Sequence, residues 1–304
     1  MPFKTELLKT SDQNFRIKNP HHQFFAKCGR QGRQTQFGFE GHLLNDWNNL
    51  TSHSHGIIPV TGPTGSGKTT TLYSTLKQLA TEQVNVCTIE DPIEMLEPSF
   101  NQMQVNNGID LGFADGVRAL MRQDPDIIMV GEIRDQDTAN MAIQAALTGH
   151  LVLSTLHTND APSSLTRLHD LGVQPFLTAA TILGVLAQRL VRKLCPHCKQ
   201  ESFLNEQEWQ HLAADYPLPR PEFVFKAVGC EECRHTGYKG RIGIYEFMPL
   251  SLETKQLIGA DANLNQLRQQ AKKEGVEPLR IAGARKVVEG MTTLEEVLRV
   301  VPLN

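Results

Sequence analysis

The stretch Gly62-Pro63-Thr64-Gly65-Ser66-Gly67-Lys68-Thr69 decides the fold of this chain. It fits G-x-x-x-x-G-K-[S/T], the loop that holds the phosphates of a nucleoside triphosphate. The apolar run 56–61 ahead of it predicts a short buried strand, and residues 70–79 behind it predict a helix. Because strand, loop and helix are the context that the motif requires, a chance glycine-rich turn is the weaker interpretation.

The motif assigns roles to its own residues. Its glycines let backbone N–H groups wrap a phosphate at the N-terminus of the helix, where the helix dipole favours negative charge. We expect Lys68 to reach the β- and γ-phosphates of ATP and the Thr69 hydroxyl to bind Mg²⁺. The predicted nucleotide-binding residues are Gly62, Pro63, Thr64, Gly65, Ser66, Gly67, Lys68, Thr69 and Thr70.

Composition excludes several classes of protein. The chain has 304 residues, of which 40% are hydrophobic, so it can bury the core of one large domain or two smaller ones. Its net charge of −3 gives no overall attraction to nucleic acid. Nothing approaches the roughly 18 uninterrupted apolar residues of a membrane span, and residues 1–20 have no apolar core of a secretory signal. We therefore expect a cytosolic protein whose six cysteines bind metal or stay free.

Strand and helix patterns alternate along the chain, which predicts an α/β fold with a mostly parallel sheet. With the phosphate loop after its first strand, this order resembles the RecA-like core of P-loop NTPases. Short apolar runs predict further strands at 84–89, 126–130 and 151–155. Periodic segments predict helices at 41–50, 113–121, 138–147, 176–194, 263–273, 278–289 and 293–300.

Four regions are predicted. Residues 1–35 are polar and aperiodic and form an unassigned, poorly ordered lead-in. The RecA-like ATPase core covers residues 36–190. A zinc-binding tetracysteine module covers residues 191–246, and a C-terminal helical region covers residues 247–304.

Acidic residues follow two of the predicted strands. Glu90-Asp91-Pro92-Ile93-Glu94 comes after one strand, and Val130-Gly131-Glu132 ends another. Ligands of an open α/β sheet bind beyond the carboxyl ends of its strands, so both groups should lie beside the phosphate loop. A triphosphatase needs one acid for the Mg²⁺ shell and one to orient the attacking water. Solvated loop acids are the alternative, but two acidic strand ends after a phosphate loop favour function.

His150 and His157 flank the predicted strand at 151–155. Either residue alone would be read as a structural hydrogen-bonding group. Together they could instead sense the γ-phosphate or couple subunits. The residues by themselves leave both interpretations open.

Two C-x-x-C pairs, Cys195-Pro196-His197-Cys198 and Cys230-Glu231-Glu232-Cys233, predict a structural zinc site. Redox thiols and an iron–sulfur cluster are the alternatives. Neither pair has a βαβ context, and the spacing matches no ferredoxin run. His197 or His235 could replace one cysteine as a ligand, and Cys28 and Cys87 are read as plain thiols.

Beyond these motifs, residues 38–300 resemble the assembly ATPases of type II secretion and type IV pilus systems. The segment 90–94 is similar to the aspartate box of that family, 122–135 to its atypical Walker B segment and 148–159 to its histidine box. Ala187-Gln188-Arg189-Leu190 leads into the cysteines and 237–246 follows them, in the order the family has.

The resemblance implies roles and partners. Glu94 would be the base that polarises water, Glu132 would hold Mg²⁺ through its water shell, and His150 and His157 would lie near the γ-phosphate and the subunit boundary. The tetracysteine module belongs to the extension and secretion branch, since the retraction ATPases lack it. The cofactors would be ATP, Mg²⁺ and Zn²⁺. The partners would be further copies in a hexamer and an inner-membrane platform protein, with no nucleic acid and a place at the cytoplasmic face.

The chain also departs from the family pattern. Members of this branch carry an N-terminal docking region and a Per-Arnt-Sim-like β domain, whose arginines reach a neighbouring nucleotide. Here Arg16, Arg30 and Arg33 match none of them, and Pro59 interrupts the strand that leads into the loop. The expectation is a motor for pilus or pseudopilus assembly, with a truncated, weakly catalytic nucleotide-binding scaffold as the alternative. A DNA translocase is disfavoured by the charge.

Overall fold

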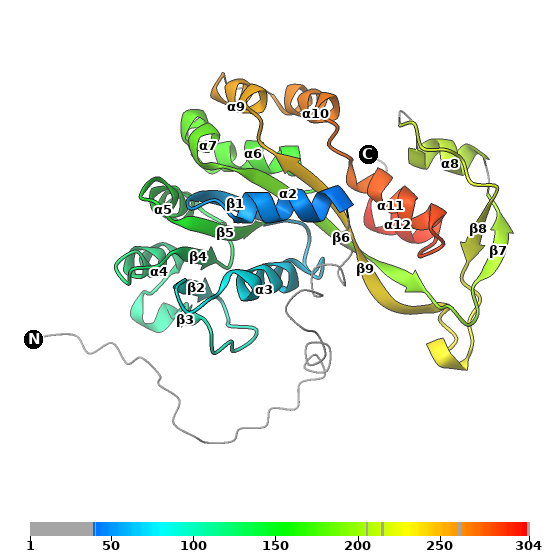
Figure 1. Cartoon of the computed structure of the whole chain (residues 1–304), viewed down its shortest axis with the longest axis horizontal. Helices are drawn as coiled ribbons and strands as arrows, with labels where there is room; N and C mark the ends of the chain where they lie inside the picture. Colours follow the sequence, from blue (N-terminus) through cyan, green and yellow to red (C-terminus); the bar gives the residue numbers. More distant parts are fainter. Residues whose placement is uncertain (1–38, 40, 205, 214–215, 261–262, 303–304) are drawn as a thin grey trace, which may run out of the picture.

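A seven-stranded sheet organises the chain (Figure 1), in the order β3-β2-β4-β5-β1-β6-β9. Each neighbouring pair is parallel except β6 and β9, which confirms the predicted α/β fold with a mostly parallel sheet. The strands are β1 (Gly56–Thr61), β2 (Val86–Glu90), β3 (Asn101–Gln104), β4 (Ile127–Val130), β5 (Leu151–Leu156), β6 (Gly184–Leu194) and β9 (Tyr238–Pro249). This computed structural model describes residues 39, 41–204, 206–213, 216–260 and 263–302. The predicted lead-in at 1–35 lies outside the described residues.

Helices cover both faces of the sheet. Ile58 and Val60 of β1 pack with Trp47 and Leu72 in one buried cluster, whereas Ile57 points into the other cluster. The first face carries α2 (Gly41–Thr51) and α3 (Lys68–Leu79). The second face carries α4 (Phe113–Leu120), α5 (Gln136–Leu147), α6 (Ala161–Asp170) and α7 (Pro175–Thr181). Burial on both faces explains why the central strands read as continuous apolar runs.

The C-terminal half adds a small insert and a group of helices. The insert after the first cysteine pair comprises β7 (Gln200–Phe203), α8 (Glu206–Ala213) and β8 (Phe223–Lys226), with β7 and β8 forming a separate antiparallel pair. The closing helices are α9 (Leu252–Gly259), α10 (Leu264–Lys273), α11 (Leu279–Val288) and α12 (Leu294–Val300). The 3₁₀ turns are η2 (Asn107–Ile109) and η3 (Glu231–Cys233). Among the described helices, none combines the length and the apolar character needed to cross a bilayer.

The prediction of one long helix over 176–194 is wrong. Helix α7 ends at Thr181, and the chain then forms the long strand β6 from Gly184 to Leu194. Most of β6 is buried between β1 and β9, so its sequence shows no two-residue alternation that would identify a strand. Strands β6 and β9 also continue across the expected domain boundaries at residues 190 and 246.

Pro59 fits its place in β1 because the ladder with β6 is irregular there. The backbone N–H groups of Gly56 and Gly62 point toward β5. Because backbone groups alternate between the two sides of a strand, the nitrogen of Pro59, which carries no hydrogen, points toward β6. Ile57 is opposite Ile182 and Val60 is opposite Leu186, so the chain on the β6 side has one residue more than β1 between these two pairs. The regular hydrogen-bond ladder is therefore interrupted beside Pro59.

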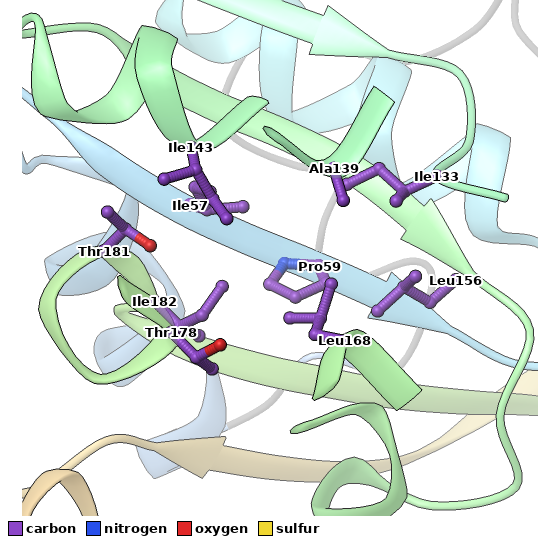
Figure 2. Close-up of a pocket in the computed structure, with 10 residues that line it drawn as sticks. All are labelled: Ile57, Pro59, Ile133, Ala139, Ile143, Leu156, Leu168, Thr178, Thr181 and Ile182. Atoms are coloured by element: carbon purple, nitrogen blue, oxygen red, sulfur yellow. The ribbon is translucent and has the colours of Figure 1, made fainter. Parts of the chain in front are cut away.

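The ring of Pro59 lines an apolar cavity of about 10 Å³ under α5, α6 and α7 (Figure 2). A cavity of this size and character is a packing defect and not a ligand pocket.

Glu246 ties two helices to the sheet. It lies on β9 opposite Ala187, and only 5% of the residue is exposed. One carboxylate oxygen accepts the N–H of Ala161 at 2.8 Å, and the other accepts the N–H of Leu279 at 3.1 Å. These donors belong to the first residues of α6 and α11, where backbone N–H groups have no partner inside the helix. Burial raises the pKa of Glu246 to about 7, against the effect of the two N–H donors.

We predict that Glu246→Gln lowers the free energy of unfolding by about 1–3 kcal/mol at pH 5, because the amide NH₂ cannot accept from a helix N–H. The pKa of Glu246 is about 7 in the folded chain and 4.5 ordinarily, so its contribution to stability is present below 4.5 and is lost as pH rises through 7. The deficit of the variant should therefore shrink from pH 5 to pH 8. Urea unfolding at both pH values measures this, with the exposed Glu82→Gln as control. A deficit that grows with pH would contradict it.

Candidate functional site

The phosphate loop joins the carboxyl end of β1 to the first turn of α3. Gly65 has φ 79° and Gly67 has φ 89°, a backbone region that glycine adopts without strain. Gly67 is the N-cap residue of α3, and no side chain caps this helix. The first-turn N–H groups are therefore available to an anion at the positive end of the helix dipole. These features are those of a phosphate site.

Lys68 is buried and folds back over the loop. Its ammonium donates to the carbonyl oxygens of Gly62 at 2.8 Å and Pro63 at 3.1 Å. Burial lowers the pKa of Lys68, and the negative charges of Glu132 and Glu94 oppose this shift. Both predicted acids are thus near enough to act electrostatically on the loop lysine.

The loop also contains a polar atom that fits a ligand. The Ser66 hydroxyl is buried, and it has no hydrogen-bond partner within the described residues. A buried hydroxyl usually has a partner, so this orphan group inside a phosphate loop supports a nucleotide phosphate as the missing acceptor. The residues present therefore fit a bound nucleoside triphosphate.

Glu132 lies just beyond β4, beside the loop, with 9% of its surface exposed. The backbone under it is held by the Thr155 hydroxyl, which donates to the carbonyl of Gly131 at 2.7 Å. Its carboxylate pairs with Arg134 and lies 3.5 Å from Nε2 of His157. The carboxylate of Glu132 therefore lies between the guanidinium of Arg134 and the imidazole of His157.

Glu90 and Glu94 share a segment but differ in environment. Glu90 is buried and accepts hydrogen bonds from the Tyr73 and Thr88 hydroxyls, both at 2.6 Å. It is therefore fully engaged in holding β2 against α3. Glu94 is exposed on the following loop, where it is free to meet a ligand.

Two residues that the sequence did not reveal hold the loop that carries Glu94. The carbonyl of Met95 accepts from the Gln102 amide at 2.9 Å and lies 3.0 Å from the Tyr73 hydroxyl, whose single proton it shares with the nearer carboxylate of Glu90. Tyr73 is on α3 and Gln102 is on β3, so the loop is fixed from two separate elements. No motif marks either residue, because their roles arise only from the packing of distant segments.

The two histidines lie at opposite ends of β5. His157 follows the carboxyl end, beside Glu132, as the interpretation of a γ-phosphate sensor requires. His150 precedes the amino end, where its carbonyl accepts from Gly56 and its ring contacts the carbonyl of Ala145 at 2.8 Å. A six-residue strand spans about 20 Å. His150 therefore lies at the edge of the sheet opposite the phosphate loop of its own chain, because the amino and carboxyl ends of a parallel strand open on opposite edges. A role for His150 near a γ-phosphate or a subunit boundary stays a prediction.

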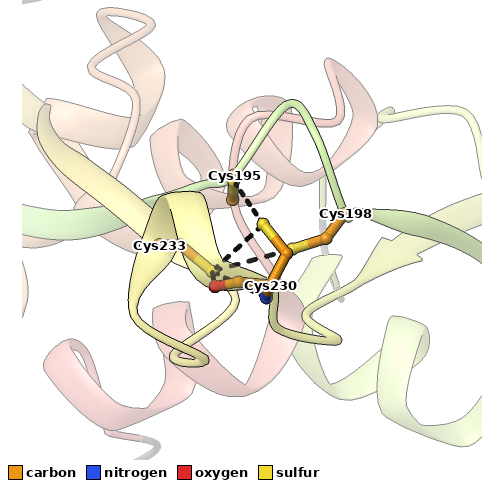
Figure 3. A group of neighbouring side chains, drawn as sticks. All are labelled: Cys195, Cys198, Cys230 and Cys233. Carbon is orange, nitrogen blue, oxygen red and sulfur yellow. Dashed lines mark hydrogen bonds between the residues drawn. The ribbon is translucent and has the colours of Figure 1, made fainter.

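The four cysteines of the C-x-x-C pairs converge at the far ends of β6 and β9 (Figure 3). Their sulfur atoms lie within 4.8 Å of one another. The Cys195–Cys230 sulfurs are 3.9 Å apart, and those of Cys198–Cys233 and Cys230–Cys233 are 3.8 Å apart. A tetrahedral ion with bonds of about 2.3 Å to sulfur needs sulfur–sulfur distances of about 3.8 Å, so the cluster fits Zn²⁺.

Backbone groups around the cluster favour thiolates. Although burial works against the charged form, N–H donation from Cys230 and Gly237 lowers the pKa of the Cys233 thiol to about 6. At Cys198 burial outweighs the N–H of Gly229, which donates to the sulfur at 3.3 Å, and raises the pKa of the thiol to about 11. Thiolate is the form that binds a metal. His197 and His235 are not among the group of side chains that converges here.

The fold and the loop define a P-loop nucleotide-binding protein of the α/β class. The family model described as "Type II/IV secretion system protein" matches residues 30–299. The chain therefore belongs to the type II/IV secretion system protein family.

Named relatives agree with this assignment. The chain is 78% identical over 269 residues to "Type IV pilus assembly ATPase TfpB" of Acinetobacter baylyi, covering 88% of this chain and 46% of the relative. It is 48% identical over 263 residues to "Type II secretion system ATPase E" of Vibrio cholerae, covering 86% of this chain and 52% of the relative. The chain thus spans about half the length of these curated relatives.

Solved structures share the fold. The pilus retraction motor PilT with bound ADP superposes with a TM-score of 0.62 at 28% identity, covering 85% of this chain and 65% of that structure. The Legionella pneumophila ATPase DotB superposes with a TM-score of 0.63, covering 88% of this chain and 65% of DotB, and at 23% identity it supports the fold alone.

We predict that the chain purified without chelator carries one zinc per molecule. Cys198→Ser should reduce the zinc content, because a hydroxyl replaces one of four thiolates. Cys87→Ser serves as the matched control, since Cys87 is buried in β2 outside the cluster. Elemental analysis of the three proteins gives the answer. Absence of zinc from the wild type, or four cluster thiols that react freely in the folded chain, would count against the site.

Proposed function

We propose that this chain is an ATP-hydrolysing motor subunit that powers assembly of a type IV pilus or a type II secretion pseudopilus. The observation that supports this most is that two acids from different strand ends, Glu132 after β4 and Glu94 after β2, both act electrostatically on Lys68 of the phosphate loop, against the effects of burial and of Arg189. A bare phosphate site needs only the loop, whereas hydrolysis needs acids placed beyond it. The names of the relatives supply the process, pilus assembly or protein secretion.

In this proposal the site residues divide the work. The first-turn N–H groups of α3 and the Lys68 ammonium hold the β- and γ-phosphates. The Thr69 hydroxyl would bind Mg²⁺ and Glu132 would hold the ion through its water shell, and the ion would supply charge neutralisation at the transferring phosphoryl group. Glu94 orients the attacking water and accepts its proton. His157 reports the γ-phosphate through Glu132, its neighbour at 3.5 Å.

The wider setting is also part of the proposal. The chain would work as a homohexamer at the cytoplasmic face of the inner membrane, against a platform protein of the assembly machine, and without nucleic acid. The tetracysteine cluster supports the extension and secretion branch of the family. The alternative is a nucleotide-binding scaffold with weak turnover. Turnover measured together with light scattering separates the two, because only the motor should show robust hydrolysis in a stable oligomer.

We predict that Lys68→Ala weakens binding of ATP–Mg²⁺ by about 1.5–3 kcal/mol, because a charge-assisted phosphate contact is lost. Lys77→Ala is the control, since Lys77 lies on the same helix but pairs with Glu97. Calorimetric titration with a nonhydrolysable ATP analogue measures both variants. Equal affinity of wild type and Lys68→Ala would refute nucleotide binding at this loop.

We predict that Glu94→Gln lowers kcat by about 10²–10⁴ while the dissociation constant for ATP stays close to that of the wild type. A group that acts on the attacking water stabilises the transition state and not the ground state. Glu97→Gln is the control, because this acid of the same loop pairs with Lys77 instead. Normal turnover by Glu94→Gln would remove Glu94 from the chemistry. Glu132 would then take its place, since Glu90 is already engaged by Tyr73 and Thr88.

A further inference from the structure

A buried glutamine on β6 touches both halves of the phosphate-loop unit. Only 1% of Gln188 is exposed. Its Nε2 donates to the carbonyl oxygen of Ser66 at 2.7 Å, and its Oε1 accepts from the Thr71 hydroxyl at 2.8 Å. Ser66 lies in the loop and Thr71 lies in the first turns of α3, so one side chain spans the junction between loop and helix.

The chemistry of the two contacts fixes the orientation of the amide. The carbonyl oxygen of Ser66 can only accept, so it must face the NH₂ group. The Thr71 hydroxyl then donates to the remaining oxygen. Both polar atoms of Gln188 are therefore satisfied in a place from which water is excluded, and loss of either contact leaves a buried polar group unpaired.

The loop glycines confirm how closely β6 approaches. A Cβ at Gly67 would lie 2.9 Å from the side-chain Nε2 of Gln188. A Cβ at Gly62 would lie 2.5 Å from the backbone carbonyl oxygen of Gln188. Neither distance is tolerated by real Cβ atoms. The phosphate loop thus packs directly against strand β6.

Strands β6 and β9 connect this contact with the phosphate loop to the rest of the C-terminal half. Strand β6 ends at Leu194, directly before Cys195, and β9 begins at Tyr238, five residues after Cys233. Gln188 is opposite Tyr245 in this pair, and the next position joins Ala187 to Glu246, which holds α6 and α11. Figure 1 shows the pair, the last two strands of the sheet, running on toward the insert that carries β7 and β8.

We propose that Gln188 is a positioning residue that couples the conformation of the phosphate loop to the β6–β9 strand pair. When a nucleotide binds, its phosphate oxygens accept hydrogen bonds from the loop N–H groups and take the Lys68 ammonium from the carbonyl oxygens of Gly62 and Pro63. The carbonyl of Ser66 and the hydroxyl of Thr71 take part in that rearrangement, and Gln188 transmits it to β6. This inference rests on the proposed nucleotide binding. By thermodynamic linkage, a strand pair that responds to the nucleotide must in turn affect nucleotide affinity.

The first measurement is the affinity for ADP–Mg²⁺ of wild type and three variants. Gln188→Met removes both contacts at similar volume, and Thr71→Val removes only the second contact. Ser74→Ala is the matched control, because the Ser74 hydroxyl is buried on α3 and has no partner within the described residues. We expect a loss of affinity of about tenfold or more for Gln188→Met, and of about three- to tenfold for Thr71→Val. The affinity of Ser74→Ala should stay within about twofold of the wild type.

The second measurement is hydrogen exchange of the wild type and of Gln188→Met with and without ADP–Mg²⁺. ADP should slow amide exchange in residues 185–194 and 238–248 of the wild type, and this protection should be absent or much reduced in the variant. A residue that merely fills the core would lower stability without changing this nucleotide-dependent pattern. Gln188→Glu, which keeps the acceptor for Thr71 but cannot donate to Ser66, should not restore the protection.

The outcomes separate the two proposals. A wild type that fails to bind ADP refutes the proposed function and this inference with it. A wild type that binds ADP without any change of exchange in β6 and β9 refutes the coupling and leaves nucleotide binding intact. If Gln188→Met does not fold, Thr71→Val still decides, because unaltered affinity and an unaltered exchange response in that variant would overturn the role of the amide.

Discussion

The phosphate loop must turn from β1 into α3 while β6 passes in contact beneath it, and the rest of the structure depends on this constraint. Gly62 and Gly67 have no room for a Cβ against β6, and Gly65 and Gly67 have positive φ. The same contact lets Gln188 hold Ser66 and Thr71. The loop is therefore held in place by a neighbouring strand as well as by its own sequence.

Charge around the loop is arranged for a ligand that is strongly negative. The Lys68 ammonium is held by two backbone carbonyls, which phosphate oxygens can replace. Glu132 is paired with Arg134 and lies beside His157, so its carboxylate is not left uncompensated in a largely buried place. Tyr73, Glu90 and Gln102 form a separate hydrogen-bonded group that fixes the loop carrying Glu94. The Lys68 ammonium is thus held by backbone carbonyls. Glu132 and the loop that carries Glu94 are instead held by side chains.

The far ends of β6 and β9 lead into the insert, whose strands β7 and β8 pair only with each other. Trp209, Leu212 and Val224 of the insert are buried in the larger core cluster, whereas Phe203 at the end of β7 is 96% exposed. The four sulfurs beside the insert have the spacing of a tetrahedral metal site, and a structural metal supplies folding energy. Because β6 and β9 are continuous from the phosphate loop to the cysteines, this region is directly connected to the nucleotide site.

The sequence by itself determined the phosphate loop, the α/β class, most of the helices, the parallel strands β1, β2, β4 and β5, and the two cysteine pairs. These features are local: a spacing of glycines, an apolar run or a pair of thiols is complete within a few residues. It could place Glu132 and Glu94 near the loop, because carboxyl ends of parallel strands share one edge of a sheet. Only the tertiary structure decided that residues 184–194 form a strand, that His150 lies at the edge of the sheet opposite the phosphate loop, and that Glu90 is held by Tyr73 and Thr88. It also revealed Tyr73, Gln102 and Gln188. Each of these depends on contacts between residues far apart in the chain, and such contacts leave no periodicity or spacing in the sequence from which they could be predicted.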